Sequence, residues 1–232
     1  MFDSVASATE RDHELVVTAA IVPVKHLAAG KSRLATALGR DGAEQLAVAM
    51  LEDVLAALRA TQRLDAIGVV TPDPAVAAVA ERSGVRALLG DDPGLNESID
   101  RAARELGDAT RGGTLVVLGD VAGARSGDLD QMLGALASAD APCVVLAPAR
   151  DGGTAALARN PHGAIASRFG PQSAAAHRDA ARAAGVPLVE MPLASLAIDL
   201  DDADAVRAFL ATSGGGARTR AALRSIGAAA PA

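Results

Sequence analysis

Stretches of consecutive apolar residues alternate along this chain with segments whose apolar residues recur every three or four positions. Continuous apolar runs cover residues 15–24, 66–70, 85–89, 114–118, 143–146 and 187–191. Strands that are buried on both faces of a parallel sheet have this pattern. Helix-like spacing covers residues 41–59, 74–83, 126–138, 173–184 and 202–212, and a further helix ends near residue 106.

Strands that alternate with helices predict an α/β fold with a mostly parallel central sheet and helices on both faces. In residues 150–173 short apolar pieces are separated by turn residues, which predicts a small hairpin-like β insertion over the sheet. We expect one domain over residues 15–212, with loose tails at 1–14 and in the Gly/Ala-rich segment 213–232. Ligands of such sheets bind at the carboxyl ends of the strands.

Composition narrows the function classes. The 232 residues carry a net charge of −6, which argues against a protein that binds nucleic-acid backbones. The chain has three Phe and no Trp or Tyr, so it also lacks the aromatic platforms on which single-stranded bases stack. Its core must therefore consist mainly of Leu, Val, Ile and Ala.

The cysteine content and the N-terminal segment bear on the compartment. Cys143 is the single cysteine, which excludes an intrachain disulfide and a cysteine metal cluster, and its apolar neighbours predict a buried, inert thiol. The apolar run at 15–24 is too short to span a bilayer, and its acidic flank differs from a signal peptide. We expect a soluble, cytoplasmic protein.

A cationic loop follows the first apolar run. Lys25, Lys31 and Arg33 lie close to Gly30, and backbone N–H groups with Lys and Arg in such a loop can wrap a triphosphate. The segment 30–32, Gly-Lys-Ser, matches the end of a Walker A motif. That motif needs a glycine where this chain has Lys25, which argues against a P-loop protein. An ordinary solvated turn is the alternative interpretation.

Acidic residues follow two apolar stretches. Asp120 follows the apolar run 114–118, where a carboxylate points toward the ligand crevice and suits a divalent cation. Asp199 and Asp201 have the spacing that places both side chains on one face of an extended segment. Paired carboxylates repel each other unless a cation joins them, so Asp199 and Asp201 indicate a cation site. Capping of a turn by Asp120, and of the last helix by Asp201 or Asp202, is the alternative.

Two further motifs could contact ligands. Asn96 follows a turn-rich loop, where its amide could contact a base or a ribose or could cap the helix. Ser173 ends the segment RFGPQS close to a predicted helix N-terminus, which favours anions, and Thr154 follows a Gly-Gly pair. His177 lies one helical turn beyond Ser173, and a structural histidine is the alternative to a functional one.

The order of these motifs resembles the 2-phospholactate/phosphoenolpyruvate guanylyltransferase family, which acts in the biosynthesis of the deazaflavin coenzyme F-420. The resemblance extends from about Val17 to Leu210 and rests on IVPVKHLAAGKSRL, VVTPD, GLNES, LGD, GGTAAL, RFGPQSAAAH and IDLDD. It implies a Rossmann-like NTP-transferase fold. It also implies transfer of GMP from GTP to a phosphorylated three-carbon acid, phosphoenolpyruvate or 2-phospholactate, with release of pyrophosphate.

The resemblance also implies the residues of the site. The nucleotide would be bound by Pro23, Lys25, Lys31, Arg33, Thr71 and Asn96. The cofactor Mg²⁺ would be held by Asp120, Asp199 and Asp201, and the acid by Thr154, Gly170 and Ser173. Lys31, Arg33 and Asp120 would be the catalytic residues. No nucleic acid or membrane partner is implied, and a homodimer is compatible with the sequence.

The chain departs from this family after Asp120. Members usually continue with Leu-Pro, whereas this chain has Val121 and Ala122. The departure leaves the local loop geometry and the identity of the acid open. Two other functions remain compatible with the residues: a nucleotidyltransferase with another acceptor (3-phosphoglycerate, a sugar phosphate or molybdopterin), or a non-catalytic nucleotide-binding relative.

Overall fold

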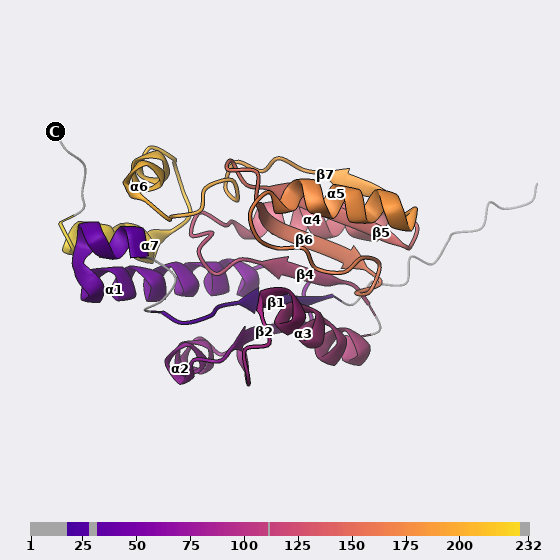
Figure 1. Cartoon of the computed structure of the whole chain (residues 1–232), viewed down its shortest axis with the longest axis horizontal. Coiled ribbons are helices and arrows are strands. Elements are labelled where there is room, and N and C mark those ends of the chain that lie inside the picture. Colours follow the sequence, from indigo (N-terminus) through magenta and orange to yellow (C-terminus); the bar gives the residue numbers. More distant parts are fainter. Residues whose placement is uncertain (1–17, 28–31, 111, 228–232) are drawn as a thin grey trace, which may run out of the picture.

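The apolar runs form one central sheet in the computed structural model, which describes residues 18–27, 32–110 and 112–227, except for the side chains of residues 32, 33, 37 and 108–110. The strands are β1 (Ala19–Pro23), β2 (Ala66–Thr71), β3 (Arg86–Leu89), β4 (Thr114–Val117), β5 (Cys143–Pro148), β6 (Thr154–Asn160) and β7 (Leu188–Glu190). They lie in the order β3-β2-β1-β4-β6-β5-β7 (Figure 1). All neighbouring pairs are parallel except the two that include β6.

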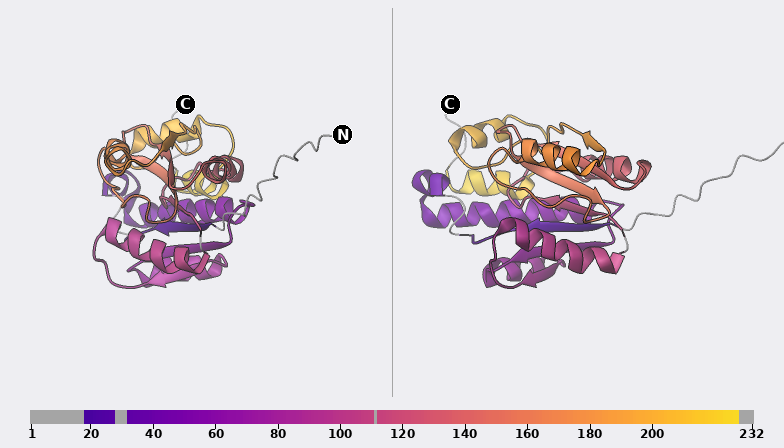
Figure 2. Two further views of the ribbon diagram at one scale, coloured as in Figure 1. Left: turned by 90° about the vertical axis from the view of Figure 1, so that its right-hand side faces the viewer. Right: turned by 45° about the vertical axis from the view of Figure 1, so that its right-hand side comes forward.

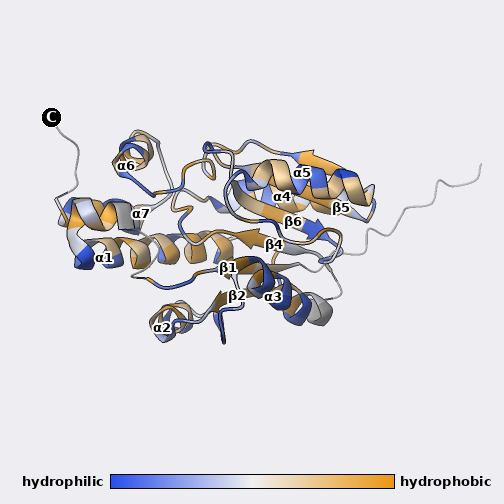
Figure 3. Cartoon of the chain, viewed as in Figure 1, coloured by the Kyte–Doolittle hydropathy of each residue, from blue (hydrophilic) through white to orange (hydrophobic). Residues whose placement is uncertain are grey.

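Helices cover both faces of the sheet, as the alternating pattern predicts (Figure 2). They are α1 (Ser32–Arg59), α2 (Pro74–Arg82), α3 (Leu95–Thr110), α4 (Ser126–Ser138), α5 (Ser173–Ala184), α6 (Ala203–Leu210) and α7 (Ala217–Ser225). The apolar sides of α1, α2 and α4 pack on one face, and those of α3 and α5 pack on the other. Apolar residues accordingly concentrate on the strands and on the inward sides of the helices (Figure 3). None of the helices in the described part of the chain combines the length and the apolar character needed to cross a membrane.

The segment predicted as a β insertion over the sheet is instead part of the sheet. Residues 154–160 form β6, which lies between β4 and β5 and is antiparallel to both. Its alanines are buried on both faces, which suits a central strand, but a local pattern does not reveal which strands will pair with it. Because β6 runs in the opposite direction, its first residue, Thr154, lies at the edge where β4 and β5 end.

The segment predicted as a C-terminal loose tail contains a docked helix. Gly214, Gly215 and Gly216 have φ values of 76°, 74° and 65°, a left-handed conformation that glycine adopts without strain. This glycine run is therefore a tight turn that returns the chain to the body of the molecule. The helix that follows, α7, buries Leu223 and Ala222 in a cluster shared with α1 and α6.

Asp53, a buried carboxylate of α1, fastens the N-terminus of α7. It accepts hydrogen bonds from the N–H groups of Arg218 (3.1 Å) and Thr219 (2.8 Å) and from the hydroxyl of Thr219 (2.8 Å). Gly216, at the N-cap position, makes no side-chain cap. The capping group thus comes from a residue far away in the sequence, which is why a search for local caps does not find α7.

The single cysteine lies where its apolar neighbours predict. Cys143 at the start of β5 is 1% exposed, and its thiol donates to the carbonyl of Leu136 at 3.6 Å. Burial raises the pKa of this thiol, with a smaller contribution from the charge of Asp140. A buried thiol that resists ionisation is a poor nucleophile, so Cys143 is a core residue.

The cap of α7 can be tested by replacing Asp53 with Ala. We expect the free energy of unfolding to fall by about 2–3 kcal/mol, because three hydrogen bonds to a buried charged group are lost. Urea denaturation measures this change. The control is Glu52→Ala, which removes a partly exposed ion pair with Arg218 (3.5 Å) and should cost at most about 0.5 kcal/mol. Equal effects of the two substitutions would show that Asp53 does not hold α7.

Candidate active site

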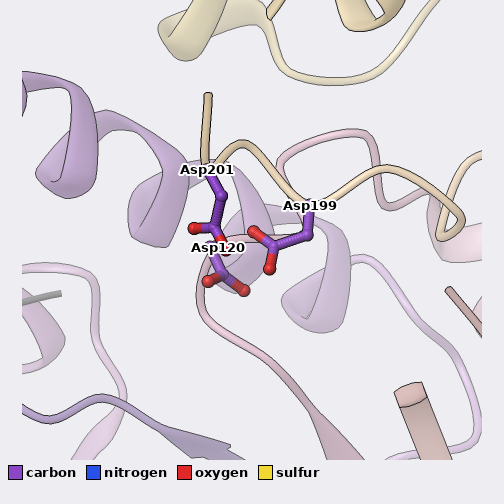
Figure 4. A group of neighbouring side chains, drawn as sticks. All are labelled: Asp120, Asp199 and Asp201. Carbon is purple, nitrogen blue, oxygen red and sulfur yellow. The ribbon is translucent and has the colours of Figure 1, made fainter. Parts of the chain in front are cut away.

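Three carboxylates from distant parts of the sequence meet at the edge where the parallel strands end. Asp120 follows β4, whereas Asp199 and Asp201 lie in the segment that precedes α6. One oxygen of each carboxylate lies within 4.8 Å of the others, and the side chains point toward one another (Figure 4). Asp120 and Asp199 are half-buried and Asp201 is exposed. Like charges at this spacing favour a shared cation, and a donor set made only of oxygens suits a hard divalent ion.

The acidic group lies at the border of two cavities. The first, of about 210 Å³, is bordered by the ends of β1 and β4 and has mostly apolar walls. Its lining residues include Pro23, Lys25, Leu95 and Asp120. The second, of about 330 Å³, is lined by Asp199 and Asp201 together with Arg150 and part of α6. A cation bound by the three carboxylates would therefore be accessible from both sides.

The loop that follows β1 is held by residues at the end of β2. The buried hydroxyl of Thr71 donates to the carbonyl of Lys25 at 3.1 Å and accepts the N–H of Asp73 at 3.0 Å. The carboxylate of Asp73 in turn accepts the N–H of Leu27 at 3.3 Å. Thr71, predicted as a nucleotide contact, thus lies beside the expected nucleotide loop, where it positions the main chain of Lys25.

Of the three predicted cations, Lys25 has a described side chain. It is about half exposed, and its ammonium group lies 3.4 Å from the carboxylate of Asp92. Lys31 falls outside the described residues. Arg33 belongs to the first turn of α1, and its side chain is not described. Lys25 can thus be placed beside the apolar cavity, while the roles of Lys31 and Arg33 stay predictions.

Thr154 and Ser173, predicted as ligands of the acid, are brought together by β6 and α5. The hydroxyl of Ser173 donates to the hydroxyl of Thr154 at 3.1 Å, and both residues are 2% exposed. Gly170 lies close by in sequence, and its carbonyl accepts the N–H of Ser173 at 3.2 Å. Its φ of 139° favours glycine at this point of the chain. The three residues form a small polar region at the N-terminus of α5.

Side chains from two helices hold the loop that leads to Gly170. The N–H of Ser167 donates to both carboxylate oxygens of Asp100 at 3.2 Å. The N–H of Arg168 donates to Nε2 of His177 at 2.9 Å, and the N–H of Phe169 donates to Oδ1 of Asn96 at 2.7 Å. Three consecutive backbone donors are therefore fixed by side chains of α3 and α5.

Asn96 makes a second hydrogen bond to this loop, since its Nδ2 donates to the carbonyl of Phe169 at 3.0 Å. The oxygen and the nitrogen of its amide group thus both bind the main chain of Phe169. The predicted contact between Asn96 and a nucleoside stays a prediction. The residue that precedes it, Leu95, lines the apolar cavity, so the start of α3 borders one cavity and holds the loop that leads to Gly170.

A buried arginine supports the same loop and was missed by the sequence analysis. Arg159 of β6 is 1% exposed, and its Nη1 donates to Asp100 (3.1 Å), to the carbonyl of Ile165 (2.9 Å) and to Ser167 (3.2 Å). Burial lowers the pKa of the guanidinium, and the charge of Asp100 opposes this effect. The one signal in the sequence was a charged residue within the apolar strand TAALARN.

His177 is fully buried, and its surroundings favour the neutral imidazole. Burial lowers its pKa to about 4, and the positive charge of Arg159 is the next largest cause. A hydrogen bond with the main chain of Ser173 and the charge of Asp100 raise the pKa, whereas the charge of Arg168 lowers it further. The ring also makes an edge contact with Phe169, at 5.0 Å between ring centroids. His177 is thus uncharged at neutral pH and packed against the loop that it binds.

The sequence also resembles known proteins. Residues 18–231 match a family model described as "Guanylyl transferase CofC like". A phosphoenolpyruvate guanylyltransferase of Sphaerobacter thermophilus is 40% identical over 191 residues, which cover 80% of this chain and 89% of the relative. Another from Conexibacter woesei is 41% identical over 220 residues, which cover 90% of this chain and 96% of the relative.

A solved structure supports the fold assignment. The crystal structure of a candidate nucleotide-diphospho-sugar transferase from Desulfovibrio desulfuricans has a TM-score of 0.73, with 91% of this chain and 95% of that chain covered. The sequence identity of 16% means that the likeness concerns the fold alone. The predicted Rossmann-like NTP-transferase fold is thereby confirmed.

The acidic group predicts a specific response to metal ions. In Asp199→Asn without metal, stability should equal or exceed that of the wild type, because repulsion among the carboxylates decreases. The rise in Tm that Mn²⁺ causes in the wild type should be largely lost. The control is Asp202→Asn, since Asp202 caps α6 by accepting the N–H of Ala205 at 2.8 Å and asparagine caps equally well. Thermal unfolding measures both, and an undiminished Mn²⁺ response in Asp199→Asn would contradict the assignment.

The lowered pKa of His177 predicts how stability depends on pH. The unfolded chain takes up a proton near the ordinary histidine pKa of about 6.5, whereas the folded protein resists protonation until about 4. Stability from this group is complete above pH 6.5 and is lost as the pH falls toward 4. Relative to His177→Gln, the wild type should lose about 2 kcal/mol between pH 7 and pH 5. Urea denaturation of both proteins at each pH measures the free energies of unfolding. If these free energies depended on pH in the same way in both proteins, the lowered pKa of His177 would be contradicted.

Proposed function

The chain belongs to the CofC-like guanylyl transferase family and is a nucleotidyltransferase, and we propose that it transfers GMP from GTP to phosphoenolpyruvate with release of pyrophosphate. This reaction belongs to the biosynthesis of coenzyme F-420, and we propose that it takes place in the cytoplasm. The observation that carries the proposal is the acidic group, which lies between an apolar cavity beside Lys25 and a second cavity. A group that can bind a divalent cation beside a cavity for the nucleotide suits a reaction between two anionic substrates.

GTP would occupy the apolar cavity. Its walls, which include Pro23 and Leu95, suit the planar base, and Asp120 at its border marks the side of the phosphates. Lys25 would neutralise part of the triphosphate charge, together with Lys31 and Arg33. The hydrogen bond from Thr71 to the carbonyl of Lys25 supports this role, because it orders the main chain from which the lysine extends.

Asp120, Asp199 and Asp201 would hold Mg²⁺, which neutralises negative charge on the α-phosphate and on the attacking phosphate when it is bound. The three carboxylates suit this ion, because Mg²⁺ prefers oxygen ligands and commonly combines carboxylates with substrate phosphates. Asp199 and Asp201 lie on one extended segment, and Asp120 lies on the loop after β4. A shared ion would therefore link parts of the fold that are distant in sequence.

Phosphoenolpyruvate would bind at the N-terminus of α5. The pair Thr154 and Ser173 can offer a hydroxyl donor, and the positive end of the α5 helix dipole favours an anion. Gly170 would allow the substrate to approach the main chain, since a Cβ atom there would meet no described atom within 4 Å. The held loop at 167–169 supports this role, because it limits how far Gly170 can move.

The reaction needs little proton chemistry from the protein. A phosphate oxygen of the acid is already ionised at neutral pH and can attack the α-phosphorus directly, as pyrophosphate leaves. What the enzyme must supply is an in-line arrangement and compensation of charge. The side chains proposed above would provide these two contributions.

The two residues after Asp120 differ from the Leu-Pro that the family usually has there. Val121 and Ala122 are buried, at 1% and 0% exposure, and the N–H of Ala124 donates to the carbonyl of Val121 at 3.1 Å. The turn is thus stabilised by packing and a backbone hydrogen bond without the proline that the family usually has. Asp120 keeps its place in the acidic group, so this departure is compatible with an active enzyme.

Pyrophosphate release tests the proposal directly. The purified protein would be incubated with Mg²⁺, one of the four nucleoside triphosphates, and phosphoenolpyruvate, 2-phospholactate or 3-phosphoglycerate. We expect release with GTP and phosphoenolpyruvate to exceed every other combination. Release with another acid would correct the acceptor. Binding of GTP without release for any acid would favour the non-catalytic alternative.

The acid site predicts a selective kinetic effect of Ser173→Ala. Loss of one hydroxyl donor to an anion should raise the KM for phosphoenolpyruvate about tenfold, while the KM for GTP changes less than about threefold. Initial rates with each substrate varied in turn measure both constants. Ser126→Ala is the matched control, because Ser126 is the first residue of α4 as Ser173 is of α5. Equal increases in both KM values would place Ser173 outside the acid site.

A further inference from the structure

His177 connects the two parts of the proposed acid site. It lies in α5, one helical turn after Ser173, and it is fully buried. Its Nε2 accepts the N–H of Arg168 at 2.9 Å, and its Nδ1 lies 3.0 Å from the hydroxyl oxygen of Thr154. Both ring nitrogens therefore contact groups that adjoin the acid site, the first through the loop and the second through β6.

The contact with Arg168 determines where the proton of the ring lies. A backbone N–H can only donate, so Nε2 must present its lone pair. In a neutral imidazole the hydrogen is then on Nδ1, which donates to the hydroxyl oxygen of Thr154. Burial and the charge of Arg159 lower the pKa of His177, which supports the neutral form.

The tautomer of His177 in turn constrains two hydroxyl groups. Thr154 and Ser173 have one hydroxyl hydrogen each, and one of these hydrogens occupies the 3.1 Å contact between their oxygens. Because His177 donates to Thr154, neither hydrogen can be directed at the ring. The remaining hydrogen is left to donate to a ligand. The opposite tautomer would draw a hydroxyl hydrogen toward the ring and away from the ligand.

We propose that His177, whose tautomer is fixed by the N–H of Arg168, is a positioning residue that acts through Thr154 and Ser173 to keep the acid site a hydrogen-bond donor. The inference rests on the proposed function, because it assumes that these hydroxyls face the acid. A hydroxyl donor suits a carboxylate or a phosphate, whose oxygens accept hydrogen bonds. His177 thereby favours a second substrate that presents an anionic group at this point over one that presents hydroxyl groups.

Two substitutions separate the two contacts of the ring. The amide nitrogen of asparagine coincides with Nδ1 of histidine, so His177→Asn keeps the donor to Thr154 and loses the acceptor for Arg168. The end of a glutamine side chain reaches the place of Nε2, so His177→Gln keeps the acceptor and loses the donor. Both variants are neutral and polar, and both lose the edge contact with Phe169.

Steady-state kinetics well below the Tm distinguish positioning from packing. In His177→Gln we expect the KM for phosphoenolpyruvate to rise about tenfold while the KM for GTP changes less than about threefold. His177→Asn should recover most of this loss, even if its Tm is the lower of the two. If both variants raise the KM for the acid equally, or if the KM follows the Tm, then His177 has only a structural role.

A second measurement keeps the inference separate from the proposed function. ¹⁵N NMR of histidine-labelled protein reports which ring nitrogen of His177 carries hydrogen, and comparison with His177→Gln assigns the signals. We expect hydrogen on Nδ1 and none on Nε2 at pH 7. The reverse tautomer would overturn the inference even if the enzyme is active. The expected tautomer in a protein without transferase activity would instead contradict the proposed function.

Discussion

Repulsion between negative charges is the constraint on which this structure depends. Asp120, Asp199 and Asp201 place carboxylate oxygens within 4.8 Å of one another, an arrangement that favours a shared cation. The proposed reaction adds a triphosphate and a phosphorylated acid at the same edge of the sheet. Lys25 lines the same cavity as Asp120, and the proposed acid site adds the N-terminus of α5, where the helix dipole favours an anion. The groups that compensate the charges of the substrates would therefore also position them.

The antiparallel strand β6 positions residues of the proposed acid site. Because β6 runs against β4 and β5, it brings Thr154 to the edge where the other strands end, and it buries Arg159 below the loop at 167–169. Three consecutive backbone donors of that loop are bound by side chains of α3 and α5. The start of α3 also borders the proposed nucleotide cavity. The two proposed substrate sites thus share one rigid element.

The sequence predicted those features that depend on local patterns. Apolar runs and helical spacing identified the α/β fold, and the resemblance to the guanylyltransferase family predicted that Asp120, Asp199 and Asp201 would meet. Features that depend on partners distant in sequence were missed. The place of β6 inside the sheet follows from strand pairing, and α7 is capped by Asp53 of another helix. The amide of Asn96 also binds the main chain of Phe169, a contact that no sequence spacing reveals.

Identification of both products by ³¹P NMR tests the central claim, that an acid phosphate attacks the α-phosphorus of GTP at the acidic group. With enzyme, Mg²⁺, GTP and phosphoenolpyruvate, two coupled resonances of a new diphosphate should grow at the same rate as pyrophosphate, and neither should form when Mg²⁺ is chelated. Release of GDP or orthophosphate instead would mean that another phosphorus is attacked, and formation of the diphosphate without a divalent ion would remove the role of the three carboxylates.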